Sequence, residues 1–137
     1  MDEPINLVLF SGTDDKLQAA AVLTAGAAAL GKPVNIFLQY WALDAFRADR
    51  IGADHGLAPE AGSAGRAAVN DLAAAGQASW AETLRLAKEL GGVDIQACSL
   101  SMDLLKLDSD DLDPLVDGVE GVTSFYLNAG EGQLVFI

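Results

Sequence analysis

Apolar residues occur along this chain in short runs that alternate with longer segments of helical spacing. Three runs, at residues 5–10, 34–38 and 93–97, are rich in β-forming residues and are bounded on at least one side by Gly or Pro. Such runs are typical of strands buried on both faces of a parallel sheet. Weaker runs at 116–119 and 134–137 predict two more strands. The pattern therefore predicts a three-layer α/β/α fold with a mostly parallel sheet of about five strands.

Segments of helical spacing separate the predicted strands. The first begins at Thr13 or Asp14, which suit the start of a helix, and it ends near Leu30, before a Gly and a Pro. Its apolar residues lie on nearly every face, and a helix of that kind is buried or lies in an interface. Residues 51–65 are rich in Gly and predict a long loop. Further helices are predicted at residues 41–50, 66–75, 79–90, 99–106 and 122–127, with a short capped turn at 108–112.

Charge and length narrow the classes of partner. The chain has 137 residues, which suits a single domain over residues 1–137. With 20 acidic against 8 basic residues its net charge is -12, so we expect no nucleic acid as partner, and anionic membranes would repel it. The longest Ala-rich run is short of a spanning helix, so we expect no membrane insertion. Asp2 and Glu3 replace the basic start of a secretory signal, and a single cysteine fits a reducing cytoplasm.

Candidate chemistry gathers where the three central strands are predicted to end. In an open parallel sheet, ligands bind beyond the carboxyl ends of the strands. A thiol between a strand and a helix start faces unpaired N–H groups and a partial positive charge, which favour the reactive thiolate. The alternative is a buried, inert cysteine, which is common because Cys packs well. The residues expected at this edge are Ser11, Gly12, Thr13, Tyr40, Trp41 and Cys98, with the hydroxyl donors Ser99 and Ser101 on the helix that follows.

Other polar residues allow two interpretations each. His55 is either a general base for the thiol or an exposed loop side chain, and Trp41 is either the floor of a ligand pocket or an apolar anchor. The acidic run at 108–113 lacks the Gly and the distal Glu of a calcium loop, so helix capping and a solvated face explain it better. One His and one Cys are too few for a structural zinc site, and the glycine motifs of nucleotide-binding proteins are absent. We therefore expect neither a metal nor a cofactor.

A longer stretch of sequence singles out the cysteine. Residues 97–105, ACSLSMDLL, look like the cysteine motif of the DsrE/DsrF/DsrH-like proteins. The nearest branch is the one often called DsrE2, sometimes labelled peroxiredoxin-like. The glycine expected near the end of the motif is replaced here by Lys106. Four further stretches agree with the family in order and spacing, at residues 9–16, 37–43, 117–122 and 134–137.

The resemblance implies a protein that handles sulfur. Members of the family carry sulfur as a persulfide on the cysteine equivalent to Cys98, pass it to partner proteins and tend to be oligomeric. We therefore expect a sulfur carrier or sulfurtransferase that works with donor and acceptor proteins or small thiols. We also expect a homo-oligomer, with the helix at 13–30 as the contact between subunits. The alternative is a non-catalytic binding or scaffold module of the same fold with an inert Cys98.

Overall fold

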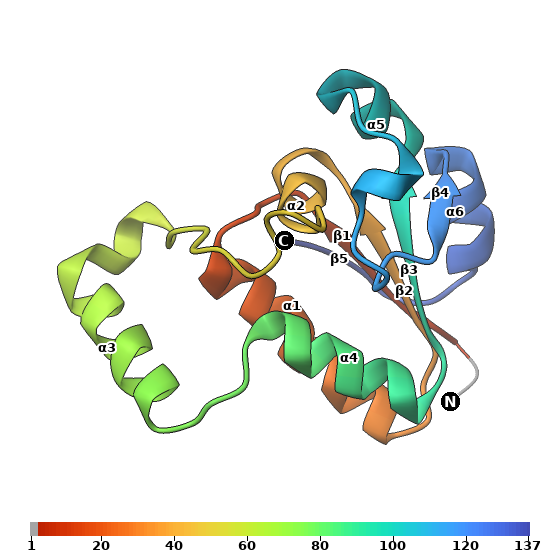
Figure 1. Cartoon of the computed structure of the whole chain (residues 1–137). Helices are drawn as coiled ribbons and strands as arrows, with labels where there is room; N and C mark the ends of the chain where they lie inside the picture. The colour runs from red at the N-terminus through yellow and green to blue at the C-terminus, as the bar shows by residue number, and fades with distance from the viewer. Residues whose placement is uncertain (1–2) are drawn as a thin grey trace.

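A single five-stranded sheet forms the centre of the molecule (Figure 1). The computed structural model describes residues 3–137, and each pair of neighbouring strands in it is parallel. The order across the sheet is β4-β3-β2-β1-β5. This arrangement confirms the predicted fold class. The strands are β1 (Ile5–Leu9), β2 (Val34–Leu38), β3 (Val93–Cys98), β4 (Gly118–Glu120) and β5 (Leu134–Phe136).

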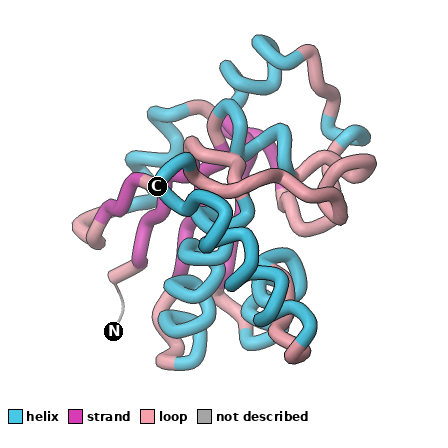
Figure 2. Tube along the Cα trace, turned by 90° about the vertical axis from the view of Figure 1, so that its left-hand side faces the viewer, coloured by secondary structure: helices cyan, strands magenta, loops and turns pink. Residues whose placement is uncertain are grey.

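Helices lie on both sides of the sheet (Figure 2). They are α1 (Asp14–Ala29), α2 (Tyr40–Ala45), α3 (Gly62–Ala74), α4 (Trp80–Leu90), α5 (Ser99–Leu105) and α6 (Val122–Ala129), with short 3-10 helices at Pro59–Ala61 and Ser109–Asp111. α1 and α4 pack against each other on one face, while α6 covers the other. α2 and α5 contact each other beyond the carboxyl ends of the strands. α3 stands away from the rest of the fold (Figure 1), and none of its residues is buried.

The two faces of the sheet carry different side chains because successive residues of a strand point to opposite sides. Toward α1 and α4 the strands contribute Leu, Ile, Val and Ala side chains to the larger core, and α4 adds Trp80. Toward α6 a smaller cluster forms from Val8, Phe37, Cys98 and Phe125. The last turn of α6 is held by side-chain amides of the sheet, since Asn6 donates to the carbonyl of Ala129 and Asn35 donates to that of Asn128.

Two predicted boundaries are wrong, and a long-range contact explains the first of them. The helix expected at 41–50 ends at Ala45, because the next residues turn so that Arg47 forms a β-bridge with Leu112. The loop expected at 51–65 ends early, since α3 begins at Gly62. Pro59 starts the 3-10 helix that leads into α3, and proline is favourable in the first turn because its φ is already helical. The other helices and strands agree with the predicted segments within two residues.

The long helix α1 is buried on its inner side only. Its buried residues, which are mostly alanines, pack against the sheet and α4, and the hydroxyl of Thr24 donates to the carbonyl of Ala20. Val22 and Leu23 are 56% and 48% exposed on the outer side. α4 therefore covers a second flank of α1, and a narrower apolar surface is left on this helix than the sequence pattern predicts. None of the helices within residues 3–137 combines the length and apolarity needed to cross a bilayer.

Candidate functional site

Cys98 lies at the junction between β3 and α5. It is the last residue of β3 and the N-cap of α5, with φ -69° and ψ 120°. Its neighbour Ala97 points into the larger core, so the side chain of Cys98 points to the opposite face, toward α6. There it belongs to one buried cluster with Phe125 and is 5% exposed. The structure therefore places the thiol at the predicted edge of the sheet, beneath a helix.

The register of the sheet aligns the ends of the three central strands. Leu9 pairs with Leu38, and Leu38 pairs with Ala97. The segments that follow these three residues therefore leave the sheet at one level. They contain the residues that the sequence predicts for the site.

One pair of predicted site residues is in direct contact. The backbone N–H of Tyr40 donates a hydrogen bond to Oγ of Ser101 over 3.1 Å. Ser101 is fully buried, and Tyr40 has a positive φ of 44°, which is uncommon for a residue with a side chain. The bond ties the start of α2, after β2, to the helix that Cys98 caps. Tyr40 is thereby held in its turn by the cysteine segment.

Gly12 and Trp41, two more of the predicted site residues, lie close together through their backbones. A Cβ placed on Gly12 would lie 2.2 Å from the carbonyl oxygen of Trp41, so no other residue fits at position 12 without a shift of backbone. The N–H of Ala42 donates to the carbonyl of Phe10 over 3.0 Å. The hydroxyls of Ser11 and Thr13 lie 3.4 Å apart on either side of the glycine. The segment after β1 therefore packs tightly on the start of α2.

Aromatic rings extend this edge to the last strand. The rings of Phe136 and Phe10 are 6.0 Å apart, those of Phe10 and Tyr40 are 5.0 Å apart, and those of Tyr40 and Trp41 are 6.0 Å apart. Trp41 and Phe136 are 55% and 64% exposed. The sequence predicts Tyr40 and Trp41 at the site but not Phe10 or Phe136. The signal that could have found them is the position of each at the end of an apolar run.

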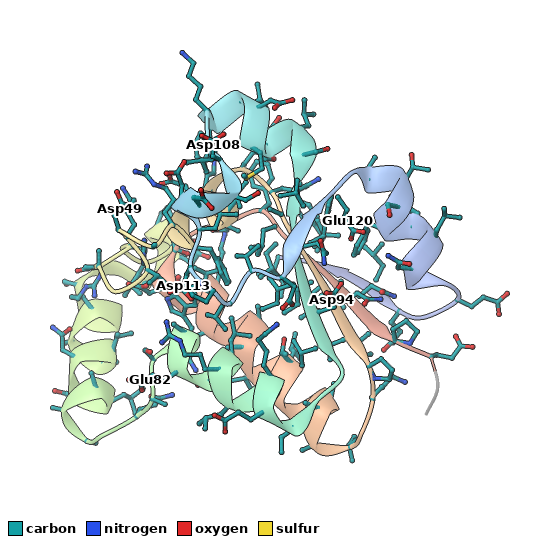
Figure 3. The ribbon with its side chains drawn as sticks, turned by 45° about the vertical axis from the view of Figure 1, so that its right-hand side comes forward. Asp49, Glu82, Asp94, Asp108, Asp113 and Glu120 are labelled. Atoms are coloured by element: carbon teal, nitrogen blue, oxygen red, sulfur yellow. The ribbon has the colours of Figure 1, made fainter. Side chains whose placement is uncertain are left out.

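The two remaining predicted donors differ in their surroundings. Ser101 is buried and its hydroxyl accepts the hydrogen bond from Tyr40, whereas Ser99 is exposed. The Oγ of Ser99 lies near Gly121, because a Cβ added to this glycine would be 3.8 Å from that oxygen. On the neighbouring strand Glu120 pairs with Cys98 in register, and the amide of Asn128 donates to its carboxylate (Glu120 is labelled in Figure 3). Ser99 and the turn after β4 therefore flank the cysteine on its outer side.

His55 does not reach the cysteine. Its ring packs against Trp80, with the centroids 5.9 Å apart, and its backbone N–H donates to the carboxylate of Asp14. Trp80 belongs to the core on the α1 and α4 side, whereas Cys98 faces α6. The interpretation of His55 as a base for the thiol is therefore not supported. Its Nε2 atom is buried with no hydrogen-bond partner among the described residues.

The acidic run near the site has a structural role. Asp108 and Asp111 form a reciprocal capping box around the 3-10 helix at Ser109–Asp111. Asp113 pairs with Arg85, and Asp117, beyond the run, accepts hydrogen bonds from Lys88 and from the backbone of Ile95. Capping and surface ion pairs thus account for this run. Within residues 3–137 no group of three or more acidic, His or Cys side chains is arranged to hold a metal ion.

The end of α5 explains the glycine expected in the cysteine motif. Lys106 has φ 55° and ψ 46°, the left-handed conformation that glycine adopts most easily. The N–H of Leu107 donates to the carbonyl of Met102, and the N–H of Lys106 donates to that of Asp103. These two bonds form the Schellman motif that commonly ends helices. The position favours glycine, and here a lysine adopts the same turn.

Comparison with other proteins decides the family. A model of the DsrE/DsrF/DrsH-like family matches residues 1–61. The uncharacterized protein YrkE of Bacillus subtilis (strain 168) is 30% identical over 149 aligned residues, which cover 93% of this chain and 92% of YrkE. This chain belongs to the DsrE/DsrF/DrsH-like family. The family model ends before Cys98, so the cysteine segment of this DsrE-like protein is identified by its own motif at residues 97–105.

Solved structures agree with the fold. The ychN protein from E. coli matches with a TM-score of 0.62 and 12% identity, covering 100% of both chains. A protein of unknown function, MTH1491 from Methanobacterium thermoautotrophicum, matches with a TM-score of 0.53 and 17% identity, covering 99% of this chain and 100% of that one. At these identities the likeness concerns the fold. The DsrE-like protein thus shares its fold with these two chains.

Proposed function

We propose that this DsrE-like protein is a sulfur carrier or sulfurtransferase that holds sulfur as a persulfide on Cys98. The observation that carries the proposal is the position of the chain's single cysteine, which ends β3 and caps α5 at the carboxyl edge of the parallel sheet. Family membership supports it, since DsrE-like proteins are sulfur relay proteins. The first N–H groups of α5 have no partner within the helix and suit a terminal persulfide anion.

The proposed transfer is an exchange in two steps. The thiolate of Cys98 attacks the outer sulfur of a donor persulfide, so the S–S bond of the donor breaks and the donor leaves as a thiolate. An acceptor thiolate then attacks the outer sulfur of the Cys98 persulfide. The S–S bond to Cys98 breaks, the acceptor takes the outer sulfur, and Cys98 leaves as a thiolate. There is no net oxidation or reduction. Because the chain has one cysteine, both donor and acceptor thiols belong to other proteins or small molecules, and a reducing compartment such as the cytoplasm suits them.

The burial of Cys98 sets a condition on this function. Cys98 shares a buried cluster with Phe125 of α6, and both are almost fully buried. α6 has only eight residues and buries only Phe125 and Ala129. We therefore propose that α6 moves aside when a donor reaches Cys98. The same burial favours a second candidate, a binding or scaffold module in which Cys98 is an inert core residue.

Intact-mass spectrometry after exposure to polysulfide distinguishes the two functions. A carrier gains one sulfur atom, and a reductant removes it. Cys98→Ser should show no such gain. If the unchanged protein gains no sulfur, or if Cys98→Ser gains as much, the sulfur-carrier proposal is wrong.

Alkylation of the native protein tests the role of α6. Phe125→Ala removes a ring from the cluster that buries the thiol and should speed alkylation of Cys98, while Leu23→Ala, an exposed side chain of α1 on the other side of the sheet, should leave the rate unchanged. Circular dichroism of both variants checks that the fold is kept. A thiol that reacts only in denaturant in all three proteins would support the scaffold function.

We further propose that the DsrE-like chain acts as a homo-oligomer. The largest exposed apolar side chains are not confined to α1. Leu127 is 79% exposed and Tyr126 is 61% exposed on α6, and Leu100 is 61% exposed on α5. An assembly that covers α6 would also affect how a sulfur donor reaches Cys98.

A further inference from the structure

A cavity of about 640 Å³ lies on the side of the molecule where α3 stands away from α1 and α4 (Figure 1). Its walls are mainly apolar and come from Ile51, Leu57, Val69, Leu72 and Trp80. The volume lies within the range of about 300–1,000 Å³ that is usual for small-molecule sites. Cys98 does not line it. The cavity is therefore separate from the proposed sulfur site.

The wall formed by α3 has little support from the rest of the chain, chiefly the exposed ion pair between Arg66 and Asp54. None of the 13 residues of α3 is buried, and Leu72 is 53% exposed. Isolated helices of fewer than about 12–15 residues are marginal in water, so packing normally stabilises a helix of this length. An occupant between α3 and α4 would supply that packing. It would bury Val69 and Leu72 against Trp80.

The charged residues at the cavity have an excess of carboxylates. Asp14 and Asp15 lie in the first turn of α1, and Glu82 lies at the start of α4 (labelled in Figure 3). None of the three has a cation within ion-pair distance among residues 3–137, and Arg85, the one basic residue lining the cavity, is paired with Asp113. Each helix start contributes only about half a positive charge. Three carboxylates against two helix starts leave a net negative charge of about two.

The carboxylates keep capacity for a ligand. Asp14 accepts hydrogen bonds from the indole of Trp80 and from the N–H of His55, and Asp15 accepts from the N–H of Ala58. A carboxylate has about four acceptor positions, so Asp14 keeps about two for a ligand, whereas Asp15 also accepts from Lys16 and Thr13 and contributes mainly through its charge. These bonds also fix the two aspartates in place at the edge of the apolar wall. The site thus presents oriented negative charge beside an apolar surface.

We propose that this cavity binds a small organic cation with an apolar body, such as an aryl-alkyl ammonium. The apolar part lies between Leu72 and Trp80, and the ammonium lies near Asp15 and Glu82. A carboxylate of the same shape is repelled, and a neutral analogue binds through the apolar contacts alone.

The test uses 4-phenylbutylamine, 4-phenylbutanol and 4-phenylbutyrate, which share one apolar body. The chain has two tryptophans, so the two indole N–H signals in an NMR titration report two sites. The Trp80 indole, bonded to Asp14, should shift and saturate with the amine, while the exposed Trp41 indole stays in place. The amine should bind at least about tenfold more tightly than the butyrate, with the alcohol between them. Hydrogen exchange in α3 should slow when the amine is bound.

Two matched pairs of variants separate charge from apolar contact. Glu82→Gln keeps a residue that can form the capping box and removes one charge. It should therefore weaken binding of the amine roughly two- to fivefold and leave the affinity for the alcohol unchanged. Glu89→Gln, on the same helix but outside the cavity, should change neither the affinity for the amine nor that for the alcohol. Leu72→Gln should weaken both ligands, whereas Leu86→Gln, outside the cavity, should not.

Three results would overturn the proposal. One is the absence of a saturable shift at Trp80, and another is a butyrate that binds as tightly as the amine. The third is an α3 already protected from exchange in the free protein, which would show that a second copy fills the cavity. None of these results bears on sulfur transfer by Cys98.

Discussion

The backbone N–H of Tyr40 donates its hydrogen bond to the side chain of Ser101, across the gap between α2 and α5. The acceptor is fully buried and lies three residues after Cys98. Replacement of Ser101 by Ala leaves that N–H without a partner, which costs about 1–3 kcal/mol. We predict a loss of this size in the free energy of unfolding, measured with urea. Ser99→Ala, an exposed serine on the same helix, should change it by less than about 0.5 kcal/mol. Equal values for the two variants would contradict the structural role of Ser101.

The turn at Lys106 predicts a gain in stability. The left-handed conformation costs a residue with a Cβ about 1–2 kcal/mol, and glycine escapes most of this cost while losing more entropy on folding. Lys106→Gly should therefore raise the free energy of unfolding by about 0.5–1 kcal/mol. Lys106→Ala keeps the Cβ and serves as the control, with no gain expected. Thermal unfolding of the two variants makes the comparison, and a gain in Lys106→Ala as large as in Lys106→Gly would show that loss of the charge is responsible.

How far the sequence predicts this fold depends on the range of the interactions involved. The strands and the helix starts at Asp14 and Ser99 follow from local apolar runs and the residues that bound them, and they are where the pattern predicts them. The end of α2 depends on the bridge between Arg47 and Leu112, which lie far apart in the sequence. No local pattern contains that contact.

The same distinction applies to the site. The rule for parallel sheets predicts that Tyr40 and the cysteine segment lie at one edge, and the bond between Tyr40 and Ser101 fulfils it. Phe136 joins the aromatic edge only because β5 pairs with β1, and the order of strands is not visible in the pattern. The burial of Cys98 in one cluster with Phe125 likewise depends on where α6 packs. Accessibility of the thiol therefore could not be predicted from its position in the chain.

Asp15 predicts a pH-dependent contribution to stability. Burial opposes its charged form, but hydrogen bonds from Thr13 and from the N–H groups of Ala58 and Lys16 outweigh burial and lower the pKa of Asp15 from 3.8. A lowered pKa in the folded state means that the charged form stabilises the fold. This stabilisation is fully present above pH 3.8 and is lost as the pH falls through the lower folded-state value.

Replacement of Asp15 by Asn should therefore be costly at neutral pH and nearly neutral in strong acid. The expected loss at neutral pH is about 1 kcal/mol, the usual size for such hydrogen bonds. Urea midpoints of both proteins at neutral pH and well below pH 3.8 measure the difference. Asp103→Asn is the control, since its exposed carboxylate accepts no hydrogen bond within residues 3–137. A loss from Asp15→Asn that is the same at both pH values would show that charge is not involved.

The last prediction concerns assembly, where the structure changes the expected contact. The sequence favours α1, whose apolar residues occupy nearly every face, but α4 covers one flank and leaves Val22 and Leu23. One face of the sheet is covered by α6 alone, and Leu127 on its outer side is 79% exposed. Burial of a side chain of this kind stabilises a contact by about 1.5–3 kcal/mol, and an acidic replacement also adds to the net charge of -12. Light scattering at micromolar concentration should therefore give a mass above the 14.2 kDa of one chain, and Leu127→Glu should lower it. Leu23→Glu on α1 should leave the mass unchanged, because that helix already has its second neighbour within the chain. A reduced mass with Leu23→Glu and not with Leu127→Glu would return the contact to α1, and a monomer mass for the unchanged protein would show that α6 is not an interface.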